Sequence, residues 1–181
     1  MGLSNESAAE YPRLIVTARV GKEERAKREL EDLLYRVDPH VRVTHTEYRD
    51  VLLVFSREDS AKIFEEVRRR PPYSVARAVR IDRCCKAAID DIVRTCLELG
   101  KKLLSRRERL RVECVKRGSA IESCRAVEIA VGISMEKAGL AIADPKNPSR
   151  VIKIELIGDL ACIGIIKPGD DKLHRLPITP R

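Results

Sequence analysis

Residues 13–37, RLIVTARVGKEERAKRELEDLLYRV, predict the first elements of the fold. The first seven of these residues are mostly apolar or β-branched and predict a strand, and Gly21 marks the turn that follows it. From Glu23 to Val37, apolar residues recur every three or four positions, the spacing that gives a helix one buried face. A strand, a turn and an amphipathic helix therefore open the chain.

The same pattern recurs in the residues that follow. Two short strands are predicted at Val41–Thr46 and Val51–Ser56, joined as a hairpin by polar residues. Ser56 is predicted to cap a second helix, which ends at a pair of prolines, and Val75–Ile81 predicts a closing strand. The order βαββαβ is that of a ferredoxin-like fold, an antiparallel sheet with both helices on one face. We assign residues 12–83 to this N-terminal domain.

Residues 84–169 predict a second domain, with no flexible linker before it. Its second helix is apolar on most sides, and Gly132 within it is expected to allow close approach of another backbone. Residues 170–181 show no periodicity and are expected to form a tail. The expected fold class is α+β, a ferredoxin-like domain followed by an α/β domain. The expected elements are a helix over Cys84–Leu104, a strand over Arg109–Val115, a helix over Ile121–Ala138, a strand over Leu140–Ala143, and a hairpin of Val151–Leu156 with Ala161–Lys167.

The charge of the chain favours a polyanionic partner. Lysine and arginine number 36 against 28 aspartate and glutamate, and residues 84–181 carry most of the excess, with 19 basic and 13 acidic side chains. Many charges of both signs, two asparagines and no glutamine are also typical of a heat-adapted surface, and we expect a thermophilic, archaeal source. No apolar stretch is long enough to cross a bilayer and no secretion signal is recognisable, so we expect a cytoplasmic protein without a membrane partner.

The chain offers little catalytic chemistry. None of its three histidines lies near a cysteine in the sequence, and adjacent carboxylates lie on helix faces expected to be solvated. No P-loop, G-x-G-x-x-G or zincin motif occurs. A small enzyme whose site is assembled from distant residues remains an alternative. We expect no catalytic residues, no cofactor, and a protein that is not an enzyme.

Six cysteines are present, at positions 84, 85, 96, 114, 124 and 162. They form no C-x-x-C pair, so no metal site is expected. Cys96, Cys114 and Cys162 occupy apolar positions and are interpreted as small core residues. Disulfides are compatible with a hyperthermophilic source, and 15 complete pairings stay open.

The turn at Lys116, Arg117 and Gly118 is the strongest local candidate for an anion site. It follows a predicted strand and directly precedes a predicted helix, whose free N–H groups and dipole attract anions. An ordinary solvated turn is the alternative. Six further cations lie between Lys101 and Arg111, and some of them are expected merely to solvate a helix end.

Four stretches of the second half resemble a THUMP domain. They are RVECVKRG at 111–118, AVEIAVGISMEKAGL at 126–140, DPKNPSRV at 144–151 and VIKIELIGDLACIGI at 151–165. The features that match are the Arg117-Gly118 pair, the Val131-Gly132 step, the Asn147-Pro148 turn and the final hairpin, in the order of the family. The resemblance implies an RNA-binding domain that recognises the acceptor stem and 3′ CCA end of tRNA and follows a ferredoxin-like domain.

This resemblance also implies partners and contact residues. We expect no catalytic domain after residue 169, and the architecture is then similar to a stand-alone adaptor that delivers tRNA to a separate acetyltransferase forming N4-acetylcytidine. A subunit serving thiolation or methylation, or a protein-interaction subunit with a basic surface, is the alternative. The resemblance carries RNA contact to Lys116, Arg117, Gly118, Lys146 and Asn147, while Arg125, Lys137, Arg150 and Lys153 are added on charge and placement.

Overall fold

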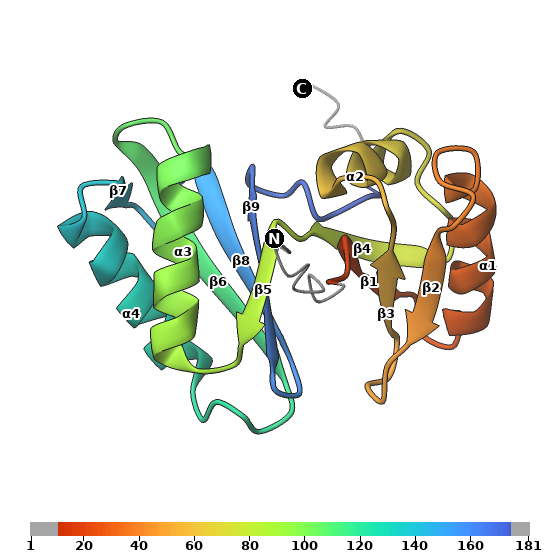
Figure 1. Ribbon diagram of the computed structural model, residues 1–181, viewed down its shortest axis with the longest axis horizontal. Coiled ribbons are helices and arrows are strands. Elements are labelled where there is room, and N and C mark those ends of the chain that lie inside the picture. The colour runs from red at the N-terminus through yellow and green to blue at the C-terminus, as the bar shows by residue number, and fades with distance from the viewer. Residues whose placement is uncertain (1–10, 175–181) are drawn as a thin grey trace, which may run out of the picture.

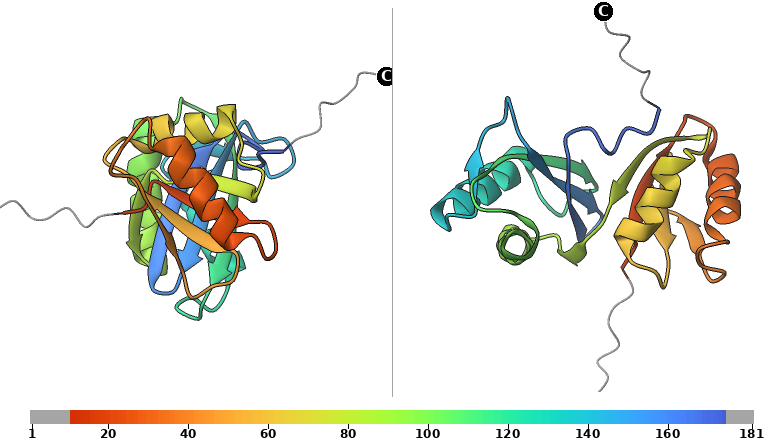
Figure 2. Two further views of the ribbon diagram at one scale, coloured as in Figure 1. Left: turned by 90° about the vertical axis from the view of Figure 1, so that its right-hand side faces the viewer. Right: turned by 90° about the horizontal axis from the view of Figure 1, so that it is seen from above.

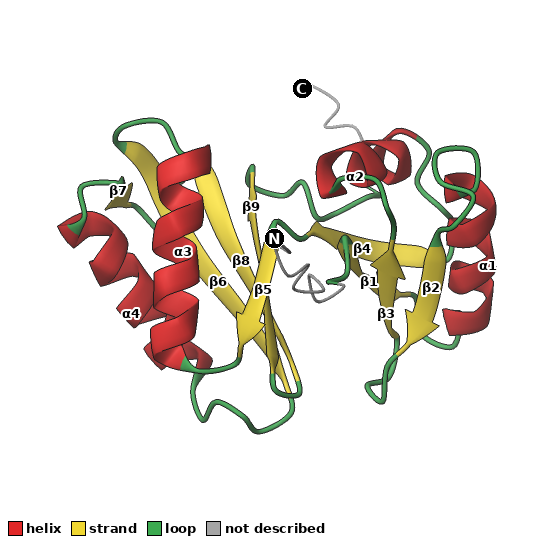
Figure 3. Cartoon of the chain, viewed as in Figure 1, coloured by secondary structure: helices red, strands yellow, loops and turns green. Residues whose placement is uncertain are grey.

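The computed structural model describes residues 11–174, which form two sheets and four helices (Figures 1 and 3). The first sheet has the order β2-β3-β1-β4, and all its pairings are antiparallel. This is the ferredoxin-like arrangement predicted from the sequence. Its elements are β1 (Leu14–Ala18), α1 (Glu23–Leu34), β2 (Arg42–His45), β3 (Val51–Phe55), α2 (Ser60–Arg69) and β4 (Val75–Arg80).

The second sheet has the order β5-β9-β8-β6-β7, in which β6 runs parallel to both β7 and β8. The other neighbours in this sheet pair antiparallel. The α+β fold class is therefore confirmed. The elements are β5 (Arg83–Lys86), α3 (Ile89–Leu103), β6 (Glu108–Arg117), α4 (Cys124–Lys137), β7 (Ala141–Ala143), β8 (Arg150–Ile157) and β9 (Leu160–Ile166).

Two local predictions are wrong. The helix expected from Cys84 begins only at Ile89, because residues 83–86 pair with β9 as a strand. Ser56 does not cap α2: its hydroxyl donates to Asp38 at 2.6 Å, and the cap is Asp59, which accepts from the backbone N–H of Lys62 at 2.9 Å. The first difference comes from strand pairing between residues distant in the sequence. The second comes from a cap placed three residues later than predicted.

The two sheets lie between two pairs of helices (Figures 1 and 2). Helices α1 and α2 cover one face of the first sheet, with Leu14 and Val16 of β1 packed against Leu30 and Ile63. Helices α3 and α4 cover the second sheet in the same way, through a core that includes Ile152 and Ile154 of β8. The alternate residues of these strands point to the other face of each sheet, where the two sheets meet.

The contact between the sheets, which we call the junction, is partly apolar. Ile15, Val79 and Ile81 of the first unit pack with Cys84 and Cys162 of the second. A Cβ added to Gly164 would lie 1.8 Å from the carbonyl oxygen of Arg80, so only glycine fits at that position. Close backbone contact therefore joins β4 to β9.

Residues 170–174 differ from the loose tail expected for 170–181. Asp171 is buried, and its carbonyl accepts from the N–H of Ala78 at 3.1 Å. Lys172 forms a β-bridge with Arg77, and the imidazole of His174 lies 2.8 Å from the carbonyl oxygen of Val75. The described part of this segment thus returns to the first unit and packs along β4, and residues 175–181 of the expected tail lie outside the described residues.

Four cysteines form disulfides, Cys84 with Cys162 and Cys114 with Cys124. The first pair is explained by register, since Cys84 lies opposite Cys162 in the β5–β9 pairing. Cys162 is a buried core residue as predicted, and Cys114 is partly buried and packs against the core of the second unit. Both also form disulfides, an outcome that the sequence had left open. Cys96 is a buried free thiol as expected, and burial raises its pKa to about 12. None of the helices between residues 11 and 174 is long and apolar enough to cross a membrane.

Candidate nucleic-acid interface

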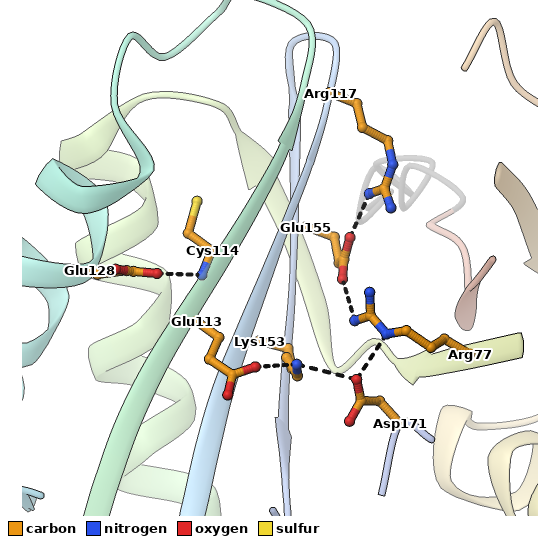
Figure 4. A network of polar contacts seen from close by, with 8 residues as sticks. All are labelled: Arg77, Glu113, Cys114, Arg117, Glu128, Lys153, Glu155 and Asp171. Carbon is orange, nitrogen blue, oxygen red and sulfur yellow. Dashed lines mark hydrogen bonds and ion pairs between the residues drawn. The ribbon is translucent and has the colours of Figure 1, made fainter. Parts of the chain in front are cut away.

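Arg117 is the last residue of β6, and its surroundings differ from the exposed turn expected. A loop of residues 118–123 separates it from α4, so it does not lie at a helix N-terminus. Its guanidinium pairs with Glu155 at 2.6 Å, and the two side chains are 16% and 1% exposed (Figure 4). The sequence did not reveal this carboxylate, which β8 brings to the junction. Arg117 is therefore engaged inside the protein.

Lys116 and Gly118 also make internal contacts. The ammonium of Lys116 donates to the carbonyl oxygens of Ile121 and Glu122, at 3.2 and 2.7 Å, and so closes the loop before α4. Gly118 has a φ of +100°, and an added Cβ would lie 2.8 Å from the hydroxyl of Tyr48. These two residues shape the loop and pack it against the first unit.

Lys153 lies in a buried ion network rather than on the surface. Its ammonium pairs with Asp171 at 3.2 Å and with Glu113, and its side chain is 9% exposed (Figure 4). Burial acts against ionisation of both carboxylates, but Lys153 and the neighbouring arginines outweigh it, so the pKa values of Glu113 and Asp171 lie below their ordinary values. Lys153 was predicted to contact RNA, and its ammonium is not accessible for that role.

The remaining candidates lie on the surface of the second unit. Arg150 pairs with Glu108 at 3.1 Å. Arg125, in the first turn of α4, has a side chain that is 78% exposed, with Glu128 at 3.9 Å. Lys137, Lys146 and Asn147 are exposed, and the N–H of Asn147 donates to Asp144 in a turn.

The structure divides the predicted site between two ends of the second sheet. Arg150 lies opposite Leu110 near the start of β6, whereas Lys116 lies six positions further along, opposite Leu156. At about 3.3 Å per residue the two ends are roughly 20 Å apart. One contact surface therefore does not include all nine residues at close range, and the end near Arg150 carries more free cations.

β6 begins at the upper left of Figure 1, near the ends of α3 and α4. Exposed lysines and arginines lie on the segments around this end of the strand. The end of α3 lies beside the end of α4, since a Cβ on Gly100 would touch Met135 and Leu140. The loop after β7 lies beside the start of β6, where Ser149 and Arg109 are hydrogen-bonded. We call the exposed cations of these segments the basic end: Lys101, Lys102, Arg106, Arg107, Arg109, Lys137 and Lys146.

The basic end lacks acidic partners in the part of the chain that the structure describes. Within residues 11–174, none of its seven side chains forms an ion pair. The nearby carboxylates have other partners: Glu108 pairs with Arg150, and Glu136 accepts from the N–H of Ala143 at 2.8 Å. A group of unpaired cations on one surface attracts polyanions. Of these seven residues the sequence-based site contained only Lys137 and Lys146, although the run from Lys101 to Arg111 had indicated the others.

Solved structures match this fold across most of the chain. PH1313 from Pyrococcus horikoshii matches with a TM-score of 0.63 at 17% identity, over 85% of this chain and 54% of PH1313. TrmN from Thermus thermophilus matches with a TM-score of 0.60 at 17% identity, over 88% and 46%. A 4-thiouridine synthetase in complex with RNA and ATP matches with a TM-score of 0.56 at 10% identity, over 87% and 41%. No protein-family model and no curated protein sequence matches the chain.

These matches support the THUMP-like fold that the sequence resemblance implied. At such identities the likeness shows the fold alone, and the chain spans about half the length of these structures or less. The prediction that the chain is not an enzyme is contradicted, because further matches are named as a predicted N6-adenine-specific DNA methylase, a possible methylase and a putative methyltransferase. That prediction depended on the lack of recognisable catalytic motifs as well as on where the sequence ends, and we withdraw it.

Proposed function

We propose that this chain binds tRNA and places it for base modification, and that the basic end makes the principal contacts with the phosphates. The observation that carries the proposal is the group of seven exposed cations that have no acidic partner among residues 11–174. They lie on a fold shared with a 4-thiouridine synthetase that was solved with RNA. Arginine predominates over lysine in the chain, and its planar fork matches phosphate geometry. Such contacts position an RNA without reading its sequence.

The 3′ CCA end and the acceptor stem are the region of tRNA that we propose is recognised. This part of the proposal comes from the THUMP resemblance in the sequence. Few aromatic side chains are available for stacking, since the sequence contains no phenylalanine, tyrosine or tryptophan after Tyr73, which lies in the first unit. Recognition of unpaired nucleotides then depends on arginine planes, backbone groups and apolar surface.

The modification served is a second question, for which two observations favour different answers. The domain order in the sequence favours delivery of tRNA to an acetyltransferase that forms N4-acetylcytidine. The names of the matched structures favour methylation or thiolation. Purifying the protein from its native lysate with its bound RNA and partners, and measuring acetylated, methylated and thiolated nucleosides in tRNA from cells lacking it, distinguishes these chemistries.

Binding of tRNA to a basic-end variant tests the proposal. Arg106→Ala/Arg107→Ala removes two exposed, unpaired charges, and we expect affinity at physiological salt to fall roughly tenfold to a hundredfold. The slope of log affinity against log salt should decrease by about 2. The matched control is Arg28→Ala/Arg36→Ala, which removes two exposed arginines from the first unit.

Equal losses in both double variants would mean that net charge alone attracts RNA, which would contradict a site at the basic end. Removing CCA from the tRNA should also weaken binding, and equal affinity for trimmed and intact tRNA would exclude recognition of the 3′ end. Binding of an acidic protein partner without measurable tRNA affinity would support the protein-interaction alternative.

A further inference from the structure

A cavity of about 450 Å³ lies between α4 and the strands β6 and β7. This volume is within the range of pockets that bind small ligands. Its walls are mainly apolar, and Met135, at the end of α4, is one of the side chains that line it. The other apolar side chains of the lining are Leu110, Val112, Ile129, Ile133, Ala141, Ala143 and Pro145.

Gly132 keeps this cavity open. It lies in the interior of α4, where glycine lowers helix stability relative to alanine. It was expected to permit close backbone approach, but apart from its adjacent residues and the backbone of its own helix, no atom lies within 4 Å of a Cβ built on it. Gly100 of α3 is different, because an added Cβ there would lie 2.5 Å from the terminal methyl carbon of Met135. Close packing against Met135 therefore explains the glycine at position 100. The glycine at position 132 instead faces open space at the cavity.

Two cations line the cavity. Arg125 is largely exposed, with Glu128 at 3.9 Å. Arg111 pairs with Glu113 at 2.7 Å through a terminal nitrogen, but its shielded Nε–H has no hydrogen-bond partner among the described residues. The three carboxylates of the lining already have partners. Glu113 pairs with Lys153 and Arg111, Glu128 accepts from the N–H of Cys114 at 3.0 Å, and Glu136 accepts from Ala143. Apolar walls with two cations suit a ligand with a flat apolar body and a negative charge.

We propose that this cavity binds one nucleotide, with its base against the apolar wall beside Gly132 and its phosphate near Arg125 and Arg111. Two sources supply that chemistry, an unpaired nucleotide of a bound RNA and a free mononucleotide. In the first case the inference rests on the function proposed above and adds a base pocket to it. The pocket is continuous with the basic end, since Pro145 in its lining precedes Lys146.

Met135 provides a direct probe of occupancy. The chain has only two methionines, Met1 and Met135, so the protein with ¹³C-labelled methionine methyl groups gives a simple spectrum. We expect the Met135 methyl resonance to shift saturably with single-stranded RNA tetranucleotides, with AMP, CMP, GMP or UMP, or with both. A shift with tetranucleotides alone identifies RNA as the source, and a shift with mononucleotides identifies a free nucleotide. No saturable shift with any of these probes would overturn the proposal.

Gly132→Leu tests the location of the ligand. The leucine side chain enters the cavity, and we expect the Met135 titration to weaken at least tenfold while the thermal midpoint does not fall. Ala126→Leu is the matched control, because residue 126 is exposed on the same helix and does not line the cavity. Equal titrations in both variants would overturn the assigned pocket.

A second variant keeps the test decisive if Gly132→Leu fails to fold. Arg125→Glu reverses an exposed charge, and we expect it to abolish the titration without unfolding the protein. An unchanged titration in Arg125→Glu would contradict the phosphate contact. Loss of tRNA binding in the Arg106/Arg107 variant tests the proposed function by itself, so failure of the pocket and failure of the function are separate results.

Discussion

The junction and the basic end use the same residue types for opposite purposes. At the junction, Arg77, Arg117 and Lys153 meet three carboxylates, Glu113, Glu155 and Asp171, and the charges balance (Figure 4). At the basic end, seven cations have no acidic partner among residues 11–174. The difference shows that the role of a cation in this protein depends on which carboxylates the topology brings to it.

Lys153→Met should produce the largest loss of stability. The ammonium of Lys153 is buried between Asp171 and Glu113, and each carboxylate would keep only its arginine partner. Removing one partner from a buried ion network leaves an uncompensated charge, so we expect the free energy of unfolding to fall by about 3 kcal/mol. Urea denaturation measures this change. Lys146→Met, an identical substitution at the basic end, should change stability by less than about 0.5 kcal/mol, and equal losses would erase the distinction between the two regions.

Arg117→Ala should have a smaller effect of the same kind. Glu155 is almost fully buried and would keep Arg77 at 3.4 Å after the substitution. We expect a loss of about 2 kcal/mol in stability, with little change in the tRNA affinity of the folded protein. Arg125→Ala serves as the comparison in both measurements, because among the described residues the ion-pair partner of Arg125 is Glu128, at a distance of 3.9 Å. A large loss of tRNA affinity in Arg117→Ala without a loss of stability would contradict the structural role and support a direct contact of Arg117 with tRNA.

Mild acid should weaken the junction to a lesser degree. The pKa values of Glu113 and Asp171 lie below their ordinary values of 4.5 and 3.8, because the attraction of Lys153 and the arginines exceeds the opposing effect of burial. A carboxyl group whose pKa is lowered in the folded state stabilises the folded protein at pH values above its ordinary pKa. This contribution is lost as the pH falls through the lowered pKa. Denaturation curves between pH 6 and about pH 3 should show decreasing stability, less steeply in Lys153→Met. Equal slopes in both proteins would contradict the assignment to this network.

The local spacing of apolar residues was sufficient to predict most of the fold. It failed where pairing between strands distant in the sequence determines the secondary structure. The residues after Cys84 fit helical spacing, yet pairing with β9 makes residues 83–86 a strand. The site was harder to predict for the same reason. Lys153 reads as one more cation on a strand, and its partners Glu113 and Asp171 come from β6 and from the segment after β9. No pattern along the sequence shows that these carboxylates meet it, whereas the run from Lys101 to Arg111 is local and was visible.

Arg107→Gly should give the smallest change in stability and separates stability from binding at a single residue. Arg107 has a φ of +62°, in the left-handed region that glycine adopts more easily than arginine. It lies in a compact turn where the N–H of Ser105 donates to Glu108 at 3.0 Å. Relief of backbone strain exceeds the extra freedom of glycine in the unfolded chain, so we expect stability to rise by about 0.5 kcal/mol. Affinity for tRNA should fall, because one charge without an acidic partner among the described residues is lost.

Arg107→Ala keeps the strain and removes the same charge, so it should weaken tRNA binding equally without raising the thermal midpoint. If Arg107→Gly instead lowers the midpoint, the side chain stabilises the fold through contacts, and the basic end would resemble the junction more than the structure indicates.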